Sequence, residues 1–243
     1  MATLGLDSDT GDASTRAGEF PRLVGKANVS TAREEILQRV RQAIVGERDS
    51  ETTVPPRDYR HVGLLDRVAR TDLLCERIGD YQAEVRRLPA SELPTVIGQV
   101  FEKRSASRVG VPAGLPVEWL PAGLQTIEDH GLSPAELDRL DGVLTGCTLA
   151  IAETGTIVLS AGPIDGRRAL SLVPDLHVCV VSEDQIVELV PEAFAALGPL
   201  VVQERRPLTF VSGPSATSDI ELSRVEGVHG PRSLVVLVTV REH

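Results

Sequence analysis

The densest group of chemically active side chains lies near the carboxyl end of the chain. The segments SGPSATSDIE, residues 212–221, and GVHGP, residues 227–231, combine hydroxyls, carboxylates and a histidine with two Gly/Pro turns. Hydroxyls and backbone N–H groups beside glycine can hold an anion, and a histidine or carboxylate can transfer a proton. Apolar runs on both sides, PLTFV and SLVVLVTV, are typical of buried strands. In open parallel sheets ligands bind beyond the carboxyl ends of strands, so the pattern predicts a ligand site there.

Most candidate ligand-binding residues of these two segments carry a hydroxyl or are glycine. They are Ser212, Gly213, Ser215, Thr217, Ser218, Glu221 and Gly230. Asp219 and His229 are the candidate groups for acid–base catalysis. A purely structural interpretation competes, because Ser218 with Glu221 forms a capping box and Asp219 complements the dipole of a short helix reaching to about Val225. Likewise, the His229 ring can simply bond a loop carbonyl. Capping does not explain the other hydroxyls of the segment.

A second candidate group is the ETGT turn between two apolar runs. Its residues are Glu153, Thr154, Gly155 and Thr156. An ionised carboxylate between buried strands is costly unless it is paired or lies at a sheet end, so Glu153 is a third candidate for acid–base catalysis. Arg167 and Arg168 follow soon after and can neutralise either Glu153 or a substrate acid. We expect all three groups to meet in one cleft at the carboxyl edge of the sheet, with PLTFV and SLVVLV paired antiparallel because their connection is short.

The cysteines argue against a metal centre. Cys75, Cys147 and Cys179 are far apart, and no C-x-x-C pattern occurs, so neither a disulfide framework nor a zinc or iron–sulfur site of this chain is expected. Cys147 and Cys179 lie in apolar runs, which favours buried structural thiols. His177 falls on the same strand face as Cys179, but a Cys–His nucleophile needs a depressed thiol pKa, and the neighbouring valines favour a structural pair.

Composition excludes several classes of protein. A net charge of −10 and only one Trp, two Tyr and four Phe argue against nucleic acid as a partner. The acidic, polar start and the lack of any eighteen-residue apolar run predict a soluble, cytoplasmic protein without a membrane span. No dinucleotide-binding, phosphate-loop or zinc-protease motif is present, and GPSAT around Ser215 lacks the second glycine of a nucleophile elbow.

The hydrophobic pattern predicts two regions. Residues 1–60 should form a flexible arm: residues 1–27 lack periodicity, TAREEILQRVRQAI is an amphipathic helix, and residues 46–60 read as a linker. In residues 61–243 helical and strand patterns alternate, and several strands are continuously apolar. Ser133 should cap a helix with Glu136, and Pro191 should kink or split another. The predicted fold is a three-layer α/β/α sandwich with a largely parallel sheet.

Four segments carry a family resemblance. ETGTIVL, SLVPDLHVCVV, SGPSATSDIE and GVHGPRSLVVLV, in this order and spacing, resemble the LUD domain of the lactate utilisation protein C (LutC) family over roughly residues 61–241. The resemblance implies a fold similar to that of ribose-5-phosphate isomerases and CoA transferases. Where some relatives have Arg or Lys this chain has Ala216, so no cation is implied there.

The resemblance also implies a role in oxidising L-lactate to pyruvate. Two partner proteins would carry the iron–sulfur clusters, and this chain, with no cofactor of its own, would be the cluster-free subunit. It would bind those partners and a small carboxylate or other anion; whether it has activity of its own stays open. One alternative is a stand-alone enzyme acting on a small phosphorylated or CoA-linked acid, with Glu153, Asp219 or His229 as acid or base. Another is a pure interaction module whose polar turns are only caps.

Overall fold

The computed structural model describes residues 29–45, 58–217, 225–226 and 230–241. The chain divides into two units, Met1–Arg57 and Asp58–His243. In the first unit the predicted amphipathic helix is present as α1 (Val29–Val45), and Ile36, Val40 and Ile44 on it are exposed. No helix within the described ranges is both long and apolar enough to cross a membrane.

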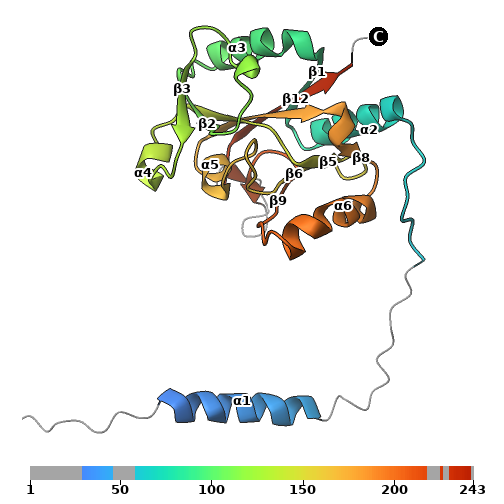
Figure 1. Ribbon diagram of the computed structural model, residues 1–243, viewed down its shortest axis with the longest axis vertical. Coiled ribbons are helices and arrows are strands. Elements are labelled where there is room, and N and C mark those ends of the chain that lie inside the picture. Colours follow the sequence, from blue (N-terminus) through green and yellow to red (C-terminus); the bar gives the residue numbers. More distant parts are fainter. Residues whose placement is uncertain (1–28, 46–57, 218–224, 227–229, 242–243) are drawn as a thin grey trace, which may run out of the picture. The chain divides into compact units, whose positions relative to one another are not determined.

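The second unit is built on a parallel sheet of six strands (Figure 1). In spatial order these are β1 (Glu84–Pro89), β12 (Ser233–Val240), β7 (Leu176–Ser182), β4 (Gly142–Thr145), β2 (Arg108–Pro112) and β3 (Gln125–Asp129). Every neighbouring pair is parallel. The central strands β12, β7 and β4 are apolar and β-branched on both faces, as burial on both sides requires. The predicted α/β fold with a largely parallel sheet is confirmed.

Helix α3 (Leu93–Lys103) covers one face of this sheet. Its apolar residues recur at helical spacing, so Leu93, Ile97 and Phe101 pack as one stripe on the sheet. Strand alternation divides β7 accordingly: Val178 and Val180 belong to the α3 side, whereas Cys179 and Val181 belong to the opposite side. The short helix α4 (Pro134–Leu137) begins at the predicted capping box, in which Glu136 N donates to Ser133 Oγ and Ser133 N donates to Glu136 Oε2.

The opposite face is covered by α2 (Arg67–Asp80) and by a second sheet that the sequence did not predict. This sheet has the order β8 (Ile186–Val187), β5 (Leu149–Ile151), β6 (Thr156–Leu159) and β9 (Thr209–Val211). Strands β5 and β6 form an antiparallel hairpin around the ETG turn, which the sequence places between two apolar runs. Helix α6 (Val190–Val202) covers the outer face of the second sheet, so α3 and α6 lie on opposite sides of the molecule (Figure 1).

The predicted pairing of PLTFV with SLVVLV is wrong. Strands β9 and β12 do not pair, because β9 joins the second sheet antiparallel to β6 while β12 lies between β1 and β7. The helix predicted from Ser218 to about Val225 falls largely outside the described residues, but Val225 belongs to strand β11 (Val225–Glu226), which pairs antiparallel with β10 (Ala216–Thr217).

The helix that the sequence predicted around Pro191 is split at that residue. A 3₁₀ turn (Glu183–Gln185) and β8 precede Pro191, and α6 begins beside it.

Candidate functional site

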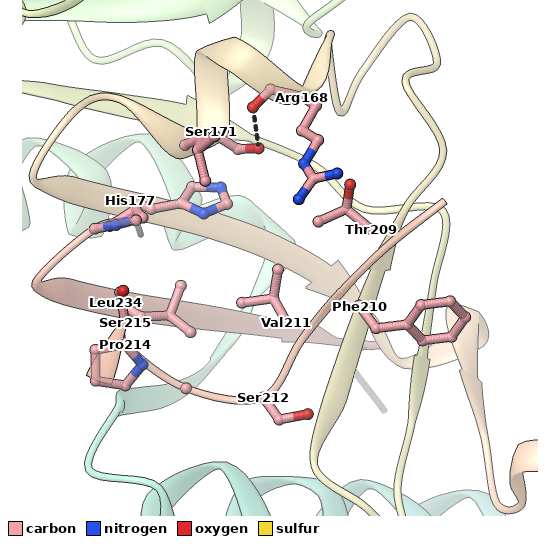
Figure 2. A pocket seen from close by; sticks show the side chains of 14 residues that line it. Arg168, Ser171, His177, Thr209, Phe210, Val211, Ser212, Pro214, Ser215 and Leu234 are labelled. Carbon is pink, nitrogen blue, oxygen red and sulfur yellow. Dashed lines mark hydrogen bonds between the residues drawn. The ribbon is translucent and has the colours of Figure 1, made fainter. Parts of the chain in front are cut away.

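A cavity of about 300 Å³ lies where the two sheets meet α5 (Arg168–Leu172). Its walls are α5, His177 of β7, Leu234 of β12, residues 209–215 and residues 230–231 (Figure 2). Three chain segments far apart in the sequence therefore contribute to one space. The cavity suits a small molecule, because pockets for drug-sized ligands usually start at roughly this volume.

The cavity lies at the opposite edge of the parallel sheet from the one predicted. His177 and Leu234 are the second residues of their strands, and residues 230–231 come just before β12. These positions are the amino-terminal ends of parallel strands, so the predicted location at the carboxyl edge is wrong. The reason is the second sheet: because β9 belongs to it, the loop that follows β9 leads to the start of β12.

The structure does bring together the hydroxyl segment and the segment before β12. Ser212, Gly213, Ser215 and Gly230 all line the cavity. Ser215 N donates a hydrogen bond to Pro231 O at 2.8 Å, which ties the two segments directly. Ser215 and Ser212 lie along one stretch of chain below the cavity in Figure 2.

The ETGT turn reaches this loop through hydroxyls. Thr156 Oγ1 lies 2.7 Å from Ser212 Oγ and 2.8 Å from Thr154 Oγ1. Gly155 has a φ of +59°, and a Cβ there would lie 2.8 Å from the backbone carbon of Arg77, so the turn requires glycine. Residues 154–156 do not line the cavity themselves. They contact Ser212, which does line it, through the hydroxyl of Thr156.

Glu153 is held away from the cavity. Its carboxylate pairs with Arg60 at 3.1 Å, and Arg60 also pairs with Glu188 at 3.1 Å. Arg167 is not its partner, because its guanidinium pairs with Asp129 at 2.6 Å. Glu153 therefore has a structural partner and, in this structure, no access to a ligand bound in the cavity.

Several candidates lie outside the described residues. They are Ser218, Asp219, Glu221 and His229. The backbone of Thr217 is described, in the β10–β11 hairpin. An acid–base role for Asp219 or His229 stays a prediction.

Gly213 has a definite structural reason to be glycine. Its φ is +110°, a conformation that side chains disfavour, and a Cβ there would lie 2.7 Å from Tyr81 Cβ. The loop therefore passes tightly against the end of α2, which fixes the hydroxyls on either side of it.

His177 lines the cavity, although its pattern suggested only a structural pair with Cys179. Its Nε2 lies 2.8 Å from Thr145 Oγ1, and the residue is 2% exposed. Burial lowers the pKa of His177 to about 4, so the ring is neutral at physiological pH. Cys179 and Cys147 are fully buried, and a hydrogen bond with Cys179 together with burial raises the pKa of Cys147 well above its ordinary range. The prediction of buried thiols is confirmed.

The buried histidine predicts a pH dependence of folding stability. In the unfolded chain His177 is protonated below about pH 6.5, its ordinary pKa. In the folded chain burial lowers this pKa to about 4, so the folded protein binds the proton only at lower pH. Stability should therefore fall as pH falls through this window, by about 2 kcal/mol between pH 7 and pH 5 from this residue. Urea unfolding at both pH values should give a smaller fall for His177→Gln than for the wild type. His130→Gln, which removes a side chain that is 72% exposed, serves as control; an equal fall in all three proteins would contradict the assignment.

Comparisons with known proteins agree with this architecture. The family model of the LUD domain matches residues 117–239. Over 212 residues the chain is 49% identical to lactate utilization protein C of Deinococcus radiodurans, covering 87% of this chain and 97% of that protein. This chain belongs to the LUD-domain family of lactate utilisation protein C.

A second relative and a solved structure also match this chain. A lactate utilization protein C from an Exiguobacterium species is 27% identical over 218 residues, covering 83% of this chain and 93% of that one. The crystal structure of a DUF162 family protein from Deinococcus radiodurans superposes with a TM-score of 0.64 and 47% identity, over 73% of this chain and all of that one. The LUD match runs from residue 117, before β3, to residue 239 in β12, so it contains every residue that lines the cavity.

Proposed function

We propose that this protein acts in L-lactate utilisation, as the cluster-free subunit of a system that oxidises L-lactate to pyruvate. The observation that carries the proposal is the 49% identity with a lactate utilization protein C over nearly the whole length of both chains. The cavity adds physical support, because the domain contains a space of about 300 Å³ with polar and apolar lining residues, suitable for a small acid.

The iron–sulfur clusters of such a system would reside in partner proteins. Clusters are usually held by four thiolates, and this chain has three cysteines. Cys147 and Cys179 are buried in the core between the sheets, and Cys75 lies on α2. These thiols do not fit a cluster site, so the proposal assigns this chain the task of binding a ligand or a partner.

Isolation of the protein from lactate-grown cells tests the partnership. A tagged copy should co-purify with proteins that contain iron and acid-labile sulfide, and much less from cells grown on glucose. The purified chain alone should not reduce a dye with L-lactate as the donor. Dye reduction by the isolated chain, or purification without any iron–sulfur partner, would contradict the proposed role; turnover of a phosphorylated or CoA-linked acid would favour the stand-alone enzyme instead.

A further inference from the structure

Arg168 presents a cationic group to the cavity. Its sequence neighbour Arg167 is bound to Asp129 through Nε at 2.6 Å and through a second hydrogen bond at 2.9 Å. The Arg168 guanidinium, by contrast, forms no hydrogen bond or ion pair with any residue in the part of the chain that the structure describes. Figure 2 shows its side chain reaching from α5 toward the strand that carries Thr209. In a chain with a net charge of −10, this arginine thus has no acidic partner among the described residues.

Neutral hydrogen-bonding groups surround this cation. Thr209 and Ser171 bring hydroxyls to the cavity wall, and no carboxylate of the described residues lines it. Ser171 Oγ donates to Arg168 O at 3.3 Å, which orients it on the same turn of α5. A planar guanidinium with neutral donors around it matches a carboxylate, which accepts two parallel hydrogen bonds.

His177 adds an uncharged polar group to the wall. One ring nitrogen is engaged with Thr145, and the other forms no hydrogen bond with any described residue. In Figure 2 the ring extends from β7 toward the space between α5 and β9. A ligand hydroxyl can either donate to this nitrogen or accept from it, so it fits both tautomers of the histidine.

Apart from residues 212, 213, 215 and 230, which are serines and glycines, the remaining wall is apolar. Leu172, Val211 and Leu234 line the cavity together with Pro214 and Pro231. Such a wall suits a short alkyl group, and apart from Arg168 no charged side chain of the described residues lines the cavity. The cavity therefore combines one cation, one neutral ring nitrogen and an apolar side.

We propose that this cavity binds a short 2-hydroxy monocarboxylate, with Arg168 holding the carboxylate and His177 contacting the oxygen on the second carbon. The choice of lactate within this class rests on the proposed function, whereas the binding of an acid at Arg168 rests on the cavity alone. Arg168 acts as the anchor and His177 as the group that selects for the hydroxyl.

Calorimetric titration of the full-length protein tests the anchor. L-Lactate should bind, and methyl L-lactate, which lacks the charge, should bind at least about tenfold more weakly. Arg168→Gln should weaken L-lactate binding by a similar factor. Arg139→Gln removes another exposed arginine, in the turn that follows α4 and away from the cavity, and should bind as the wild type does. Unchanged binding by Arg168→Gln, or inorganic phosphate binding as tightly as L-lactate, would overturn the assignment.

The contact with His177 is tested by changing the ligand. Propionate has the same carboxylate but no oxygen on the second carbon, so it should bind the wild-type protein several-fold more weakly than L-lactate. His177→Leu should remove this difference. If that variant does not fold, the comparison in the wild type decides, and equal affinities for both acids would overturn the contact. If the protein binds L-lactate but its loss does not affect growth on L-lactate, the binding site is supported and the proposed function is contradicted.

Discussion

Replacing Glu188 by alanine should lower the free energy of unfolding by about 3 kcal/mol or more. The residue is 4% exposed, and its Oε2 accepts hydrogen bonds from the backbone N–H groups of Leu64 and Leu65, each at 2.6 Å. Its Oε1 accepts from Arg60 at 3.1 Å. Alanine leaves these donors without their acceptor and frees the segment that leads into α2. Urea unfolding of the full chain measures the loss.

Glu153→Ala is the matched control, because Glu153 pairs with the same arginine. Its side chain is 49% exposed, and no backbone N–H group of the described residues donates to its carboxylate. Exposed ion pairs contribute about 0–1 kcal/mol, so this variant should stay close to the wild type. Equal losses in the two variants would mean that Arg60, and not the buried carboxylate, holds the segment in place.

Gly213→Ala should cost about 3 kcal/mol of stability and weaken ligand binding in the cavity. The φ of +110° strains any side chain, and the new Cβ would lie 2.7 Å from Tyr81 Cβ and 3.0 Å from Tyr81 O. The loop must move away from α2 to relieve this overlap, and it carries Ser212 and Ser215 with it. Thermal unfolding and titration with L-lactate measure the two effects.

Gly123→Ala separates backbone strain from overlap. Gly123 has a φ of +84°, but no atom lies within 4 Å of the position of its Cβ. This variant should lose only about 1 kcal/mol, the cost of the conformation, with unchanged ligand binding. An equal loss of stability in Gly213→Ala and Gly123→Ala would contradict the close contact between the loop and Tyr81.

Local patterns predicted the elements well, because they depend on neighbouring residues. The capping box at Ser133 and the hairpin at ETG follow from side chains within a few positions of each other. The assignment of strands to sheets failed for a physical reason. PLTFV and SLVVLVTV are both apolar runs, and such a run shows that a strand is covered but not which strand lies beside it.

The candidate site was predicted in part. Glycine and hydroxyls marked Ser212, Gly213 and Ser215, which line the cavity. His177 was interpreted as structural because alternation places a residue on a face but does not show where that face opens. The partner of Glu153 is Arg60, 93 positions away in the sequence, and no local pattern indicates such a contact.

Growth of a strain that lacks this gene, on L-lactate as sole carbon source, tests the central claim most directly. The wild-type gene and the Arg139→Gln variant should both restore growth on L-lactate. Arg168→Gln, produced at the same level, should not, and all strains should grow alike on glucose. Undiminished growth of the deletion strain on L-lactate would contradict the role in lactate utilisation, and full rescue by Arg168→Gln would contradict the role of the cavity in it.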